Sequence, residues 1–298
     1  MCGIAGYLQK DPKATPRAAD VLLDMLLALN RRGPDSAGVA LYGPTRPDGF
    51  VVRAFYGDDE ERAARVIEAL KERWPLPTAD LTAGYARLEI TTDASAAEVA
   101  AAIDRTGLEV FSIGRSLEIV KHEMRADVLR DTYGLAGFPT RHGIGHTRMA
   151  TESRVDVEHA HPFWARPFED VAVVHNGHIT NYYKLRRIFE MNGYRFMSGN
   201  DTELIAVFIA DKLARGQSLN EAVSASILEL DGSFTYLIAT REGFGIARDR
   251  YASKPGVVYE DDEIVAVASE EQAIYHAIGD KRARTREVRA REVLTWAA

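Results

Sequence analysis

The sequence predicts an α+β fold with mainly antiparallel strands, and three observations support this prediction. Helical patterns alternate with short apolar runs along the 298 residues. After Arg141 the apolar runs become short and are interrupted by polar residues, as in GIGHTRMAT and DVAVVHNGHITN. The C-terminal part is rich in strand patterns. No repeat, low-complexity tract or Pro/Ser-rich linker interrupts the chain, so we expect one domain spanning residues 2–298.

The first 140 residues carry alternating strand and helix signals. Residues 2–8 predict a strand, and Thr15-Pro16 predicts the N-cap and first turn of a helix that ends before Gly33-Pro34. Leu22, Met25, Leu26 and Leu29 recur at helical spacing in that helix. The further expected elements are strands over 36–42, 50–56, 81–90 and 107–113, and helices over about 59–73, 95–105 and 121–133. The segment 44–140 is predicted to be an insertion within the domain.

The second half predicts two helices between strands. A strand is expected over 171–175, and helices are expected over about 201–215 and 219–230. Asn200 or Asp201 is the expected N-cap of the first helix. Its buried stripe is expected to be Leu204, Ile205, Phe208 and Ile209. Strands then follow over 233–240, 244–249 and 263–269, with short pieces near 285–296.

Composition excludes several classes of protein. The chain has 37 Lys+Arg against 44 Asp+Glu, a net charge of −7, which argues against binding to nucleic acid or to an anionic membrane. It contains no apolar stretch long enough to span a bilayer and no secretory signal pattern. A single cysteine rules out internal disulfides and cysteine-type structural zinc sites, and it predicts a reducing, cytoplasmic location.

That cysteine is Cys2, directly after the initiator methionine. Removal of Met1, which a small second side chain permits, would place the thiol beside a free α-amine. An α-amine has a pKa of about 7.7–8.0, so it can accept the proton of a thiol whose pKa is near 8.5. Nucleophile and base would then share one residue. The alternative is an inert, buried side chain on the first strand.

Six motifs in order resemble the class II glutamine amidotransferases, which are N-terminal-nucleophile hydrolases. The motifs are Cys2-Gly3-Ile4, Arg32-Gly33-Pro34-Asp35-Ser36-Ala37-Gly38, Gly145-His146-Thr147-Arg148-Met149-Ala150-Thr151, Ala160-His161-Pro162-Phe163, His175-Asn176-Gly177 and Asp201-Thr202-Glu203. Any one of them is weak evidence, but all six in order argue against coincidence. The resemblance implies a four-layer αββα sandwich and hydrolysis of L-glutamine through a Cys2 γ-glutamyl thioester.

The resemblance also implies the site. Asn176 and Gly177 would supply the N–H groups that stabilise the oxyanion formed when Cys2 attacks the glutamine amide. Arg148 offers a two-pronged donor for the substrate carboxylate, and Asp201 offers a counter-charge for its ammonium. Thr151 would help hold the same polar end. Arg32 would shape the pocket.

Each assignment has a structural alternative. Asn176-Gly177 would be a plain turn, Asp201 a helix cap, Arg148 a surface ion pair, and Arg32 a turn clamp. Relatives often have an aromatic residue and a His-Gly pair where this chain has Met149 and Glu152-Ser153.

Neither a metal nor a cofactor is expected. His146, His161 and His175 match no usual metal-ligand spacing and are expected to be satisfied polar or core side chains. The chain has no Gly-rich phosphate loop, flavin site or iron–sulfur cysteine cluster. An amidotransferase must pass its ammonia to an acceptor site, so the sequence implies a separate synthase subunit.

The arrangement is similar to the stand-alone glutaminase subunit of glutamate-synthase-like and N-methylglutamate synthase complexes, whose partner chains bind flavin and iron–sulfur clusters. The basic stretch 281–286 would dock such a partner, although a solvated strand face is the simpler interpretation. Two other functions stay open. One is a stand-alone hydrolase of γ-glutamyl amides, and the other is a non-catalytic subunit that senses glutamine.

Overall fold

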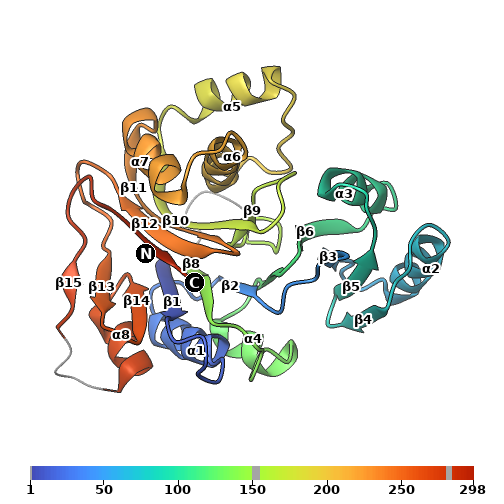
Figure 1. Ribbon diagram of the computed structural model, residues 1–298, viewed down its shortest axis with the longest axis horizontal. Coiled ribbons are helices and arrows are strands. Elements are labelled where there is room, and N and C mark those ends of the chain that lie inside the picture. Colours follow the sequence, from blue (N-terminus) through green and yellow to red (C-terminus); the bar gives the residue numbers. More distant parts are fainter. Residues whose placement is uncertain (1, 150–154, 280–283) are drawn as a thin grey trace.

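The chain folds into three antiparallel sheets with helices packed on their faces (Figure 1). The computed structural model describes residues 2–149, 155–279 and 284–298. All of its strand pairs are antiparallel. The predicted α+β class is therefore confirmed. None of the described helices is long and apolar enough to cross a membrane.

The N-terminal strand lies inside a seven-stranded sheet of order β15-β13-β14-β1-β8-β2-β7. Its strands are β1 (Gly3–Gln9), β2 (Ser36–Tyr42), β7 (Leu117–His122), β8 (His142–Arg148), β13 (Val257–Glu260), β14 (Ile264–Ala268) and β15 (Arg286–Glu287). β1 is bonded to β14 on one side and β8 on the other, with Gly3 opposite Thr147. This register brings Cys2 beside the end of β8, where Arg148 and Met149 lie.

A five-stranded sheet of order β16-β12-β11-β10-β9 faces the first one. Its strands are β9 (Phe163–Trp164), β10 (Val171–Ile179), β11 (Gly232–Thr240), β12 (Gly243–Arg248) and β16 (Val293–Ala297). Ile4 and Leu8 of β1 share one apolar core with Leu237 of β11 and Phe244 of β12. The inward faces of the two sheets therefore pack against each other, because alternate residues of each strand point into the space between them.

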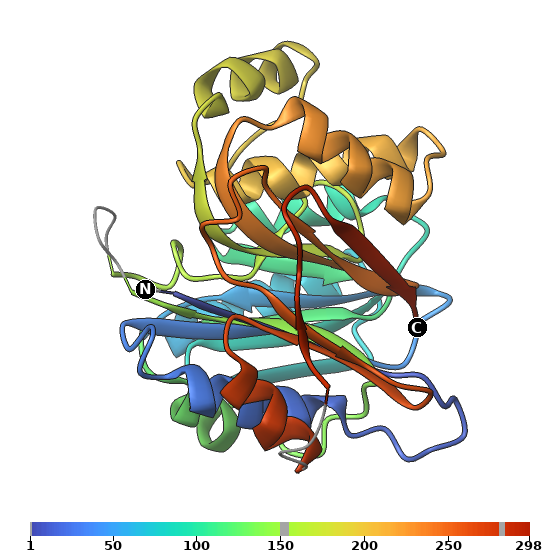
Figure 2. The ribbon, with the colours of Figure 1, turned by 90° about the vertical axis from the view of Figure 1, so that its left-hand side faces the viewer.

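Helices cover the outer faces of both sheets (Figure 2). α1 (Ala18–Leu29), α4 (Ala126–Thr132) and α8 (Glu271–Ile278) lie on the seven-stranded sheet, and α5 (Tyr182–Met191), α6 (Asp201–Ala214) and α7 (Leu219–Glu229) lie on the side of the five-stranded sheet. Every residue of α6 from Thr202 to Asp211 is buried, including the predicted Leu204, Ile205, Phe208 and Ile209. α6 therefore holds its first turn, which carries Asp201, in a fixed position.

A smaller four-stranded sheet of order β4-β5-β3-β6 lies beside this body (Figure 1). It consists of β3 (Gly49–Phe55), β4 (Thr78–Thr82), β5 (Tyr85–Thr91) and β6 (Glu109–Gly114), with α2 (Glu60–Lys71) and α3 (Ala96–Asp104) packed against it. The segment 44–140 therefore divides between two places. Residues 49–114 build the small sheet and its helices, whereas β7 and α4 belong to the larger body.

Some sequence-based element predictions are wrong. Residues 81–90 are not one strand, because Ala83 (φ 47°) and Gly84 (φ 87°) form a left-handed turn between β4 and β5. The expected helix over 121–133 starts only at Ala126 and is preceded by β7. α1 begins at Ala18 without a side-chain cap, so Thr15 is not its N-cap. Helices α5 and α8 and strand β13 had no predicted counterpart.

Candidate active site

Cys2 directly precedes the first residue of β1 and lines a cleft of about 670 Å³ between the two large sheets. Its Sγ accepts a hydrogen bond from the Met149 backbone N–H at 3.4 Å, and the side chain is half-buried. Its carbonyl oxygen accepts hydrogen bonds from Arg32 Nε (2.9 Å) and Asn176 Nδ2 (3.1 Å). The thiol is therefore accessible from the cleft, while the backbone that carries it is held from both sides.

The Arg32 loop is pressed against β8. A Cβ on Gly33 would lie 2.4 Å from the carbonyl carbon of Thr147, so only glycine fits there. The Arg32 guanidinium then reaches the Cys2 carbonyl and forms an ion pair with Glu270 at 2.5 Å, just before α8. Arg32 thus clamps the N-terminal strand and also lines the cleft. A direct contact between Arg32 and glutamine remains a prediction.

Asn176 and Gly177 lie within a strand rather than in a turn. β10 continues to Ile179, and Asn176 and Gly177 pair with Thr235 and Phe234 of β11. The expected strand end at residue 175 is therefore wrong, and so is the alternative of a plain turn. Gly177 has a φ of 140°, and a Cβ there would lie 2.1 Å from the Ser233 carbonyl oxygen. Glycine is required at this position, and its N–H borders the cleft without a side chain beside it.

Three groups fix the direction of the Asn176 amide. Nδ2 donates to the Cys2 carbonyl and to Ser269 Oγ (3.2 Å), while Oδ1 faces His146 Nε2 at 3.1 Å. Burial lowers the pKa of His146 to about 3, so its ring is neutral and carries one proton. Because Oδ1 can only accept, that proton is on Nε2. His146 and Ser269 therefore hold the amide with its N–H groups toward Cys2.

The sequence analysis expected His146 to be a satisfied polar or core side chain and did not single out Ser269. A signal for His146 was present, because strand residues two apart point to the same face. Ile144 of β8 lies in the core between the sheets, so His146 and Arg148 also face the five-stranded sheet. Ser269 had no comparable signal. It follows β14, and only the pairing of β14 with β1 brings it to Asn176.

Asp201 opens α6 but does not cap it. The Asn200 side chain accepts from the Thr202 N–H at 2.9 Å, which resolves the choice of cap and leaves the Asp201 carboxylate for other contacts. Its Oδ2 accepts from the Ile179 N–H at 2.8 Å, and His175 Nδ1 lies 3.4 Å from Oδ1. Burial raises the pKa of Asp201, but the charge and hydrogen bond of His175, the Ile179 N–H and His178 together outweigh it. The net pKa is lowered, so the carboxylate is ionised at neutral pH.

Arg148 ends β8 and is 5% exposed. It lines the same cleft as Cys2, Asn176, Gly177 and Asp201, so five of the predicted residues share one cavity, and Arg32 is the sixth. Thr151, Glu152 and Ser153 lie outside the described residues. Among the residues that the structure describes, no group of three or more His, Cys, Asp or Glu side chains is arranged to hold a metal ion.

The three motif histidines cluster at the cleft, where His161 and His175 are lining residues and His146 lies behind them. Thr202 Oγ1 lies 3.2 Å from His175 Nδ1 and 2.9 Å from His161 Nε2. The rings of His146 and His161 pack edge to face, with their centroids 4.1 Å apart. Burial lowers the pKa of His161 well below its ordinary value. His142, also in β8, is buried against Tyr42, and burial lowers its pKa to about 4.

We expect mild acid to destabilise the fold through these histidines. Below about pH 6.5 the unfolded chain binds protons at His142, His146 and His161, whereas the folded chain keeps them neutral. The free energy of unfolding should therefore fall as the pH drops from 7.5 to 5, by up to about 1.4 kcal/mol per pH unit for each histidine. Urea unfolding across this range measures the slope. H142Q should reduce the slope, and a stability that stays constant or rises toward pH 5 would contradict the assignment.

The fold is that of the N-terminal-nucleophile amidotransferases. The chain superposes over 99% of its length on the structure of glutamine phosphoribosylpyrophosphate amidotransferase from B. subtilis, with a TM-score of 0.64 and 20% identity. It spans 47% of that longer chain. Residues 146–276 match the model of the glutamine amidotransferase domain.

The sequence relatives extend the match to nearly the whole chain. A putative glutamine amidotransferase of Methanothermobacter thermautotrophicus is 38% identical, covering 92% of this chain and 93% of the relative. The glutamine amidotransferase-like protein GlxB of Rhizobium meliloti is 35% identical, covering 99% and 98%. The chain belongs to the glutamine amidotransferase family, and it is an enzyme.

Proposed function

We propose that this enzyme hydrolyses L-glutamine to L-glutamate and ammonia at Cys2 and supplies the ammonia to a separate synthase subunit. The main support for hydrolysis is that a thiol, two N–H donors and two opposite charges line one cleft. The residues are Cys2, Asn176, Gly177, Arg148 and Asp201. A zwitterionic substrate with a side-chain amide matches this set of groups.

The reaction uses one residue as both nucleophile and base. Once Met1 is removed, the Cys2 α-amine takes the thiol proton, directly or through a water, and the thiolate attacks the side-chain carbonyl of glutamine. The C–N bond breaks as a proton passes from the amine to the leaving nitrogen, which departs as ammonia. Water then attacks the γ-glutamyl thioester with the same amine as base. This step yields glutamate and restores the thiol.

Asn176 and Gly177 stabilise the negative charge on the oxygen of the tetrahedral intermediate by donating hydrogen bonds to it. Asn176 Nδ2 already lies beside the Cys2 carbonyl, and in the intermediate it turns one N–H toward the oxyanion. The Gly177 N–H is the second donor. Both N–H groups of Nδ2 already donate, to the Cys2 carbonyl and to Ser269 Oγ, so one of these bonds is exchanged for the bond to the oxyanion. The bond from His146 to Oδ1 keeps the NH2 end of the amide toward Cys2 during this exchange.

Arg148 and Asp201 bind the amino-acid end of the substrate. The Arg148 guanidinium pairs with the α-carboxylate and the Asp201 carboxylate with the α-ammonium, and Thr151 holds the same end. Arg32 acts from the other side by fixing the Cys2 carbonyl. In this scheme, residues at the end of β8 and the start of α6 bind the amino-acid end of glutamine. Residues at β1 and β10 carry out the chemistry at its amide.

Replacing Arg148 by lysine should raise KM for glutamine more than it lowers kcat. Lysine keeps the charge but loses the planar pair of donors. One charged hydrogen bond is worth about 1.5–3 kcal/mol, so KM should rise about 10- to 100-fold. Steady-state kinetics measure both constants. R187K, on an exposed position of α5, is the matched control. An unchanged KM in R148K would contradict a role in carboxylate binding.

The second part of this proposal is that a separate synthase subunit receives the ammonia. It is supported by the resemblance to stand-alone glutaminase subunits, whose partners carry flavin and iron–sulfur clusters. A catalytic free thiol also suits the reducing cytoplasm, where we place the enzyme. Co-purification of a synthase chain whose binding raises glutaminase activity would support ammonia transfer.

Two other experimental outcomes would each support a different function. Full activity of the isolated chain on γ-glutamyl amides, with no such partner, would favour a stand-alone hydrolase. A C2A complex that still uses glutamine as nitrogen donor would favour a sensing subunit.

A further inference from the structure

The small sheet has one face that no helix covers. Val52, Leu88 and Ile90 point toward α2 and α3 and join the apolar core. Side chains of the opposite parity point the other way, and there Arg53 and Arg87 lie directly across from each other on β3 and β5. Like charges directly opposite on neighbouring strands destabilise a sheet. This face therefore requires an anionic partner.

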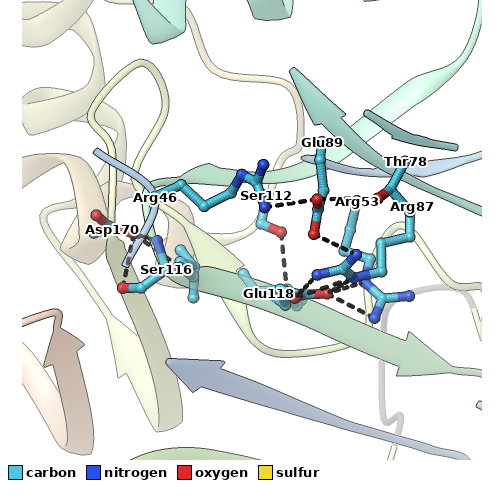
Figure 3. Close-up of polar contacts among 11 residues, drawn as sticks. Arg46, Arg53, Thr78, Arg87, Glu89, Ser112, Ser116, Glu118 and Asp170 are labelled. Carbon is cyan, nitrogen blue, oxygen red and sulfur yellow. Dashed lines mark hydrogen bonds and ion pairs between the residues drawn. The ribbon is translucent and has the colours of Figure 1, made fainter. Parts of the chain in front are cut away.

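One anionic group that faces these arginines is Glu118 of β7, on the edge strand of the seven-stranded sheet. Its Oε2 accepts from Arg53 Nε at 2.7 Å and from Arg87 Nε at 2.9 Å, and its Oε1 accepts from Arg87 Nη2 at 2.8 Å. Figure 3 shows Arg46 and Arg87 reaching Glu89 from opposite sides, and Arg46 Nη1 is 2.6 Å from Glu89 Oε2. Each of the four carboxylate oxygens of the two glutamates is therefore engaged.

The arginines keep donors that these carboxylates do not use. Within the described residues, Nη1 of Arg53 and both Nε and Nη2 of Arg46 have no hydrogen-bond acceptor. Arg53 is nonetheless buried, with its side chain 8% exposed, and Glu118 is 4% exposed. Arg46, Arg53 and Arg87 face Glu89, Glu118 and also Asp80, which pairs with Arg87 across β4 and β5, so the charges balance and it is the unused donors that would hold a bound anion. Nη1 of Arg53 is not sealed from solvent, so this donor is open to a bound acceptor.

The spare donors border a cleft of about 820 Å³ that is separate from the Cys2 cleft. Arg46, Arg53, Arg87, Ser116 and Tyr133 are among its lining residues. Asp80, the third acidic group of the lining, lies exposed on β4 across from Arg87. We propose that this cleft is a second binding site, for a small oxyanion, either a carboxylate or a phosphate monoester, held by Arg46 and Arg53. It is independent of the proposed glutamine chemistry.

Titration calorimetry on the full-length protein tests the site, with inorganic phosphate and acetate as separate probes. We expect one of the two to bind with a stoichiometry near one, and which one binds distinguishes the two sources of the oxyanion. R46Q should weaken binding at least about 10-fold, because one charged hydrogen bond is worth about 1.5–3 kcal/mol. Arg46 is 30% exposed at its side chain, so this variant should fold.

The control is R65Q, which removes an equal charge from the exposed face of α2 and should leave binding unchanged. A second variant, C2A, should also bind the probe normally, which separates this site from the glutamine cleft. The proposal is overturned if neither probe binds at millimolar concentration. It is also overturned if R46Q and R65Q bind equally, because the anion would then be responding only to net charge.

Discussion

Replacing Cys2 by alanine should abolish glutamine hydrolysis and leave the fold unchanged. The thiol is the nucleophile in the proposed reaction, and loss of a nucleophile lowers kcat by about 10⁴-fold or more. The described contacts of Sγ are only with the backbone of Met149, so little packing is lost. Steady-state ammonia release measures the activity, and urea unfolding checks the stability.

C2A should still bind glutamine, because Arg148 and Asp201 are intact. Calorimetry with L-glutamine therefore provides the internal control. If C2A hydrolyses glutamine at a substantial rate, Cys2 is not the nucleophile. If it is inactive but also unstable, the matched variant C2S, which keeps the size of the side chain, separates loss of chemistry from loss of fold.

Replacing Asn176 by alanine should lower kcat about 10²- to 10³-fold with little change in KM. Removal of one oxyanion donor has an effect of this size because the hydrogen bond forms mainly in the transition state. KM should stay nearly constant because, in the proposed reaction, Arg148 and Asp201 bind the other end of the substrate. A large rise in KM with unchanged kcat would instead make Asn176 a substrate-binding group.

The orientation of the Asn176 amide adds a sharper test. H146L removes the donor to Asn176 Oδ1, and we expect kcat to fall about 10-fold, the equivalent of 1.4 kcal/mol. In a double-mutant cycle, H146L should have no further effect once Asn176 is alanine. H142L is the matched control, a buried histidine on the same strand that bonds Thr240 instead. Equal, additive losses from H146L and H142L would show that His146 has only a structural role.

Local patterns predicted several strands and helices of the large body. Residues 36–42 form β2 with the predicted bounds, and the expected helix over 219–230 is present as residues 219–229. The missed strand β7 has a clear physical cause. β7 contains Glu118 and Lys121, which a sequence reading takes as exposed, yet both are buried. Glu118 is paired with two arginines, and Lys121 donates to the Glu158 and Ala160 carbonyls, partners that are distant in sequence.

The candidate site was also predicted only in part from the sequence. Family motifs named Cys2, Asn176, Gly177, Arg148, Asp201 and Arg32, and the structure brings these six to one cleft. The groups that position them came only from the fold. His146 and Ser269 meet Asn176 because β8 and β14 belong to one sheet and β10 to the sheet that faces it. No spacing along the chain encodes that contact.

Intact mass analysis of the protein, quenched with acid during turnover of L-glutamine, shows whether Cys2 is both nucleophile and base. We expect a mature chain that lacks Met1 and a fraction carrying one additional glutamyl group, which fragmentation places on Cys2. The adduct should be absent from C2A. A fully active protein that retains Met1, or an acyl group on any other residue, would contradict the claim that Cys2 is both nucleophile and base.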